Sequence, residues 1–101
     1  MKEFDDCYAI DDNEQALACL KTIVRTATGD CRPRLVFISE KNCDPCEHEK
    51  AIHRADLSSG IIQEISAESP EGMAIIKKNN IEFVPALLFL DCRDNLILPG
   101  V

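Results

Sequence analysis

An apolar segment that leads almost directly into a Cys-x-x-Cys motif limits the folds open to this chain more than any other feature. Residues 34–39 form a continuous apolar run between Pro33 and a polar loop, which is typical of a buried strand. The motif at 43–46, Cys-Asp-Pro-Cys, then begins a helix expected over 44–59. The apolar segment at 61–66 predicts a second strand, parallel to the first, because a strand-helix-strand crossover makes a parallel pair.

The rest of the chain continues this alternation of helices and strands. Asp12 and Ser69 are suited to cap helices, and Pro70 is suited to a first helical position. We expect helices over 13–28, 44–59 and 70–79, and strands over 34–39, 61–66, 86–90 and 96–98, the last two joined by a hairpin. A length of 101 residues suits one domain, 1–101, of the α/β class with a mixed four-stranded sheet and helices on both faces.

Charge excludes several classes of partner. The formal net charge is −7, so nucleic acid and anionic membrane surfaces are unfavourable partners. Acidic residues dominate the N-terminus, and we interpret 1–12 as an exposed, flexible arm. No apolar signal segment is visible there, so the expected location is cytoplasmic.

Six cysteines suggest redox chemistry. Without a secretory signal, they are expected to be reduced, redox-active or metal-bound rather than permanently bridged. Cys43 lies where a helix begins, and the unpaired N–H groups and positive dipole end there stabilise a thiolate. Cys46 lies within disulfide reach of Cys43. The alternatives are a structural pair, or a zinc site with His48 and His53, whose spacing fits no common zinc motif.

These features resemble the thioredoxin superfamily over about two-thirds of the chain. The resemblance rests on two features: Cys-x-Pro-Cys at a strand-to-helix junction, and the Val84-Pro85 step that precedes the strand at 86–90. The resemblance implies a thioredoxin-like three-layer sandwich with a cis Val84–Pro85 bond. It also implies that Cys43 and Cys46 are catalytic residues. The substrate-binding positions that it implies are Asp44, Pro45, Val84 and Pro85.

The chain departs from that family in ways that change the expectations. Asn42 replaces the usual Trp, and Phe37 falls where many members carry a buried carboxylate. Asp44 and Glu47 add negative charge, so we expect a thiolate at Cys43 to be less stabilised than in the family. The family's C-terminal helix is absent, which would leave part of one sheet face open, and the helix at 13–28 would cover the other face. An open face would suit a homodimer or a bound partner.

The remaining cysteines give weaker predictions. The family's antiparallel strands would bring Cys31 and Cys92 near each other as a second thiol pair, although two separate thiols are favoured. Cys7 is expected to be a free thiol and Cys19 a small buried apolar residue.

The function indicated is a thiol-disulfide oxidoreductase that reduces protein disulfides through Cys43 and Cys46. It would need no cofactor or metal, but a separate reductase would have to recycle it. The alternative is a thioredoxin-like adaptor whose Cys-x-x-Cys is weakly active or structural.

Overall fold

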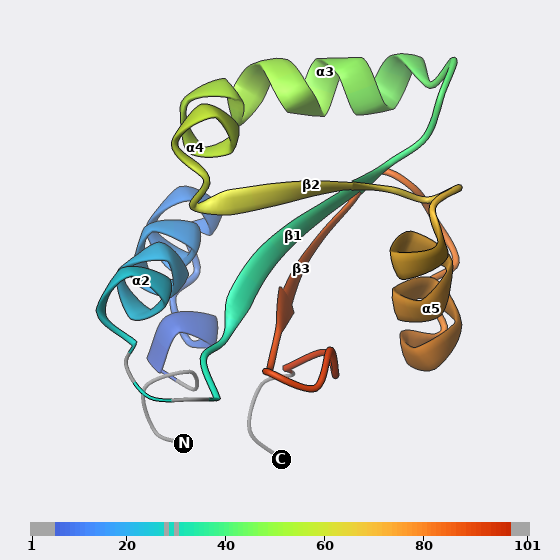
Figure 1. Ribbon diagram of the computed structural model, residues 1–101. Coiled ribbons are helices and arrows are strands. Elements are labelled where there is room, and N and C mark those ends of the chain that lie inside the picture. Colours follow the sequence, from blue (N-terminus) through green and yellow to red (C-terminus); the bar gives the residue numbers. More distant parts are fainter. Residues whose placement is uncertain (1–5, 28, 30, 98–101) are drawn as a thin grey trace.

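The centre of the fold is a three-stranded mixed sheet in the order β2-β1-β3 (Figure 1). The computed structural model describes residues 6–27, 29 and 31–97. Strand β1 (Arg34–Ser39) pairs in parallel with β2 (Ile62–Ser66) and antiparallel with β3 (Ala86–Leu90). The first two strands are parallel because a helical crossover joins them, as the sequence predicted.

The expected four-stranded sheet is wrong for the described residues. Beyond β3, Leu96 forms only an isolated bridge with Leu90, and residue 98 lies outside the described part of the chain. The backbone N–H of Leu96 donates instead to the side-chain oxygen of Asn79, at 2.9 Å. The bonds toward β3 come from the neighbouring residues: Ile97 N–H donates to the Phe89 carbonyl at 2.9 Å, and Asp91 N–H donates to the Asn95 carbonyl at 2.9 Å. Leu96 is thus a non-hydrogen-bonded position whose own N–H points away from β3, and within the described residues the pairing stops at this single bridge.

The helices begin largely where their caps predict. The Asp12 side chain accepts the Glu14 N–H ahead of α2 (Asn13–Thr26), and Ser69 caps α5 (Pro70–Asn79) by accepting the Gly72 N–H. These contacts satisfy N–H groups that have no partner within the helix.

One helix was expected over 44–59, and that expectation is wrong. The segment is divided into α3 (Asp44–Ile52) and α4 (Arg54–Ser59) by His53, whose backbone leaves the helical region at φ −101° and ψ 17°. The His53 ring lies 6.4 Å from the ring of Phe37 on β1. The break therefore falls where the segment contacts the sheet.

Helices cover both faces of the sheet, as predicted. On one face, Leu35 and Phe37 pack with Leu20 of α2, and Leu57 of α4 joins the same cluster. On the other face, Val36 and Ile38 pack with Ile75 of α5. Alternate residues of β1 thus serve opposite cores, because successive side chains of a strand point to opposite faces.

The position of α2 differs from the expectation. It shares its sheet face with α4 and with the His53 contact, rather than covering the opposite face, where α5 packs (Figure 1). The physical cause is the apolar side of α2, which includes Leu20 and packs against Phe37 and Phe89. The face expected to be open is therefore covered by α2 in the described structure.

The N-terminal segment, predicted as an exposed, flexible arm over 1–12, is anchored to the core at Cys7. Cys7 is 0% exposed in the core and forms a disulfide with Cys19 of α2, with a Cα–Cα distance of 5.4 Å. The prediction of a free thiol at Cys7 is wrong, and Cys19, expected to be a small buried apolar residue, is half-buried and disulfide-bonded. Residues 1–5 lie outside the described part of the chain.

Candidate functional site

The candidate site is built around a disulfide between Cys43 and Cys46 at the start of α3. Their Cα atoms lie 5.2 Å apart. Cys43 is the N-cap of α3, and its Sγ accepts the backbone N–H of Cys46 at 3.1 Å. Pro45 occupies the first turn, where its missing N–H leaves no helical hydrogen bond unmade. The motif thus places a sulfur where a helix offers unpaired donors.

The two sulfurs differ in accessibility. Cys46 is 0% exposed, whereas Cys43 is partly exposed. A molecule arriving from solvent would therefore meet Cys43 before Cys46. This order is the one required when Cys43 makes the first attack and Cys46 resolves the product.

Acidic side chains surround the exposed end of the motif. Asp44 and Glu47 lie in the first turn of α3, and the Glu47 carboxylate lies 3.4 Å from Nζ of Lys50. Negative charge in the first turn stabilises the helix but opposes a nearby thiolate. The cap hydrogen bond would thus stabilise a thiolate at Cys43, whereas the acidic residues would destabilise it.

A second polar cluster lies under α3. Nζ of Lys50 is 2.7 Å from Oε2 of Glu64 on β2, and the buried Ser39 donates its hydroxyl to the same oxygen at 2.9 Å. The hydrogen bond from Lys50 is the largest cause that lowers the pKa of Glu64, and the Ser39 bond adds to it while partial burial opposes both. The same contact with Glu64 raises the pKa of Lys50.

Sequence reasoning did not find Glu64. It located Phe37 where the family often has a carboxylate, but Glu64 pairs with Phe37 in the parallel register and carries a carboxylate on the neighbouring strand. A charged residue inside an otherwise apolar strand was the available signal. A groove of about 450 Å³ runs beside this cluster, between Glu47, Lys50 and Glu64.

The structure brings the predicted substrate-binding residues to the same end of the sheet. The Val84–Pro85 peptide bond is cis, as the resemblance implied. Because Ile38 pairs with Ala86, Pro85 lies beside the end of β1 from which the chain continues to Cys43. Asp44 and Pro45 lie between the two cysteines on α3, and both are exposed.

The second thiol pair is bridged, so the preference for separate thiols is wrong. Cys31 and Cys92 form a disulfide with a Cα–Cα distance of 4.9 Å. The cause is the antiparallel register, in which Arg34 pairs with Leu90 and so brings the flanking segments together. This disulfide lies at the end of β1 opposite to the Cys43–Cys46 disulfide.

The histidines of the zinc alternative lie apart from any ligand set. His48 is exposed, and Nε2 of His53 lies 3.6 Å from Glu49. Within residues 6–27, 29 and 31–97, no three His, Cys, Asp or Glu side chains gather as metal ligands would. In the same residues, no helix is long and apolar enough to cross a membrane.

Comparisons with protein-family models, curated proteins and solved structures found no match. A functional assignment therefore has to rest on the residues of the site themselves, since a fold alone does not identify an activity.

Proposed function

We propose that this protein is a thiol-disulfide oxidoreductase in which Cys43 and Cys46 alternate between dithiol and disulfide. The observation that carries the proposal is the position of Cys43, a partly exposed residue whose sulfur caps α3 and is bonded to the fully buried Cys46. A cysteine at a helix N-terminus is suited to react as a thiolate. The thioredoxin-like character suggested by Cys-x-Pro-Cys and the Val84-Pro85 step belongs to the same proposal.

The reaction proceeds by two exchanges. The Cys43 thiolate attacks one sulfur of a substrate disulfide, which forms a mixed disulfide and releases the other substrate sulfur as a thiolate that takes up a proton. The Cys46 thiol then loses its proton and attacks the Cys43 sulfur. This step releases the second substrate thiol and leaves the Cys43–Cys46 disulfide. The substrate gains two electrons, and an external dithiol or reductase must return two electrons to the protein.

The direction of electron flow depends on the compartment. Three disulfides are present among the described cysteines, and such bridges are typical of oxidising compartments. They argue against the cytoplasmic location expected from the sequence. In an oxidising compartment the same two exchanges run in reverse, so that the Cys43–Cys46 disulfide accepts electrons from a substrate dithiol.

The test uses reduced protein and a peptide disulfide, with the state of each cysteine read by alkylation and peptide mass spectrometry. Wild-type protein should reduce the peptide and gain the Cys43–Cys46 bridge. Cys46→Ser should stop at a mixed disulfide on Cys43, because no resolving thiol remains. Cys43→Ser should form no adduct and show no reduction. Undiminished peptide reduction by Cys43→Ser would refute the mechanism.

An adaptor function remains the second candidate, and one observation favours it. Phe83, next to Val84, is 79% exposed, which is unusual for a large apolar side chain and suits a protein contact. A Cys43–Cys46 pair that stays bridged in every glutathione and dithiothreitol buffer would favour this function. A reversible two-electron transition would favour the oxidoreductase.

A further inference from the structure

The Cys31–Cys92 disulfide lies in surroundings very different from those of the Cys43–Cys46 disulfide. Both of its residues are exposed, which places this disulfide at the surface of the protein. Exposed disulfides tend to be the labile ones, whereas buried ones resist exchange. In contrast, the Cys7–Cys19 disulfide includes a residue that is 0% exposed.

Two arginines adjoin this exposed disulfide, and aspartates flank it as well: Asp91 precedes Cys92, and Asp94 pairs with Arg34 at 2.8 Å. Arg32 directly follows Cys31, and Arg93 directly follows Cys92. Both arginines are exposed, and no ion pair involves either of them within the described ranges. Their charge is therefore free to act on a ligand, in a protein whose formal net charge is −7.

A cavity of about 550 Å³ opens beside the disulfide. Its polar lining includes Cys92, Arg32, Arg34, Gln63 and Asp94. This volume lies in the range of small-molecule sites. The cavity therefore brings a disulfide cysteine, two guanidinium groups and one carboxylate into one space, and the carboxylate of Asp94 is paired with Arg34.

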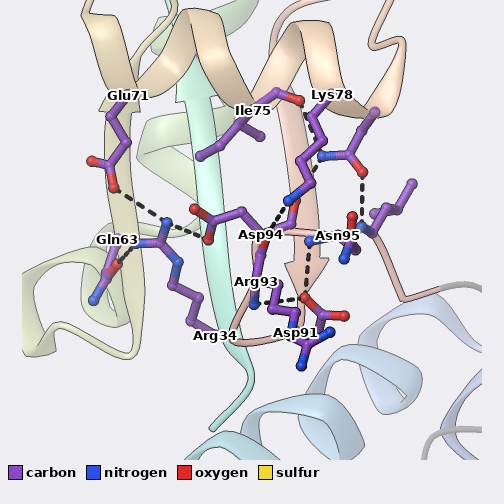
Figure 2. A network of polar contacts seen from close by, with 11 residues as sticks. Arg34, Gln63, Glu71, Ile75, Lys78, Asp91, Arg93, Asp94 and Asn95 are labelled. Atoms are coloured by element: carbon purple, nitrogen blue, oxygen red, sulfur yellow. Dashed lines mark hydrogen bonds and ion pairs between the residues drawn. The ribbon is translucent and has the colours of Figure 1, made fainter. Parts of the chain in front are cut away.

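Arg34 lines the cavity, and three polar contacts hold its guanidinium in place. Its guanidinium contacts Asp94 at 2.8 Å, Glu71 at 3.2 Å and Gln63 at 2.9 Å (Figure 2). Partial burial alone would lower the pKa of Arg34, but the hydrogen bonds and charges of Asp94 and Glu71 outweigh it and raise the pKa. Because Arg34 is already paired, Arg32 is the cavity residue whose charge can select a ligand.

We propose that Cys31–Cys92 is a second exchange site, one that reacts with a small thiol carrying negative groups, of the kind represented by glutathione. The anion binds in the cavity near Arg32, and its thiolate is directed at the Sγ of Cys92. This inference does not depend on the proposed function of Cys43 and Cys46.

The exchange takes place in two steps. The thiolate forms a bond to the Cys92 sulfur, the Cys31–Cys92 bond breaks, and Cys31 leaves as a thiolate that takes up a proton from water. A second small thiolate then attacks the small-molecule sulfur of the mixed disulfide, the bond from that sulfur to Cys92 breaks, and Cys92 leaves as a thiolate that takes up a proton from water. Two small thiols are thereby oxidised to one small disulfide, and the protein disulfide is reduced to two thiols.

The experiment compares thiols that differ mainly in charge. Folded full-length protein is treated with 2-mercaptoethanesulfonate, 2-mercaptoethanol, cysteamine or glutathione. Peptide mass spectrometry then follows the opening of Cys31–Cys92 separately from the other two disulfides, with rates expressed per thiolate. We expect the anionic thiols to react fastest and to form their first adduct on Cys92.

Variants identify the source of the preference. Arg32→Gln should lower the rate with the anionic thiols by about threefold and leave the rate with 2-mercaptoethanol unchanged. Arg32→Lys should retain the preference, and Arg54→Gln, the same charge change on α4, should have no effect.

Three results would overturn the proposal. One is a preference for cysteamine, which the net charge of the chain alone would produce. Another is an equal response to Arg32→Gln and Arg54→Gln, and the third is no opening of Cys31–Cys92 while the protein remains folded. None of these results concerns the Cys43–Cys46 pair, so the proposed function is judged separately.

Discussion

If the Cys43–Cys46 bridge opens and closes during function, its removal should lower the free energy of unfolding only slightly. The relevant perturbation is the double variant Cys43→Ser/Cys46→Ala. The bridged residues are separated by three positions, and closing so short a loop constrains the unfolded chain by about 2 kcal/mol. Because serine is a good N-cap, Cys43→Ser keeps an acceptor for the Cys46 N–H and recovers a few tenths to about 1 kcal/mol.

The other change removes a sulfur from the core. Cys46 is 0% exposed, and deleting one buried heavy atom costs about 1 kcal/mol. The three contributions together predict that the double variant loses about 2 kcal/mol. Native domains are stable by about 5–15 kcal/mol, so the variant should remain folded.

The Cys7–Cys19 bridge provides the matched comparison. Its cysteines are separated by twelve positions, for which loop closure gives about 3 kcal/mol. Cys7 is also 0% exposed, so Cys7→Ala/Cys19→Ala adds about 1 kcal/mol for the lost core atom and totals about 4 kcal/mol.

Urea unfolding followed by circular dichroism measures both variants against the wild type. The expected order is a small loss for Cys43→Ser/Cys46→Ala and roughly twice that loss for Cys7→Ala/Cys19→Ala. If the Cys43–Cys46 variant lost as much stability as the Cys7–Cys19 variant, the Cys43–Cys46 disulfide would be a structural cross-link. The reasoning that assigns it a redox cycle would then fail.

Two further predictions concern stability. Gly72→Ala should destabilise the protein by about 1–3 kcal/mol in urea unfolding, because an added Cβ would lie 1.9 Å from the Ser66 carbonyl oxygen. In a helix without this contact, alanine is more favourable than glycine by about 1 kcal/mol, so a gain in stability would contradict the packing of α5 on β2. Glu64→Gln should make the loss of stability below pH 4.5 less steep. A carboxyl whose pKa is lowered from 4.5 stabilises the fold above that value and loses this contribution as the pH falls. Urea midpoints measured between pH 7 and pH 3 test this, and an unchanged dependence of the midpoint on pH would count against the Lys50–Glu64 contact.

Local signals in the sequence predicted the local structure well. The apolar run at 34–39 is β1, and Ser69 with Pro70 begins α5. These features depend on neighbouring residues, whose backbone preferences act over a few positions. The cis Val84–Pro85 bond came from a family resemblance instead, because the residues alone favour trans.

Features that depend on distant contacts were predicted wrongly or only in part. The face chosen by α2 is set by packing of Leu20 against Phe37 and Phe89, which are far away in sequence. The pairing of Cys31 with Cys92 likewise depends on the antiparallel register of β1 and β3. Hydrophobic periodicity identifies which side of a helix is buried, but it does not identify the partner.

The opposing effects at Cys43 can be compared in magnitude. A hydrogen bond from the Cys46 N–H to a charged sulfur is worth about 1.5–3 kcal/mol, and the helix dipole adds about 0.3–1 kcal/mol. Asp44 and Glu47 are exposed, and exposed charges interact by about 0.2–1 kcal/mol each in the presence of solvent. Lys50 lies beside Glu47 and further reduces its effect. If reduction of the disulfide leaves this cap in place, we expect it to outweigh the acidic neighbours, so that a Cys43 thiolate would retain net stabilisation despite the acidic motif.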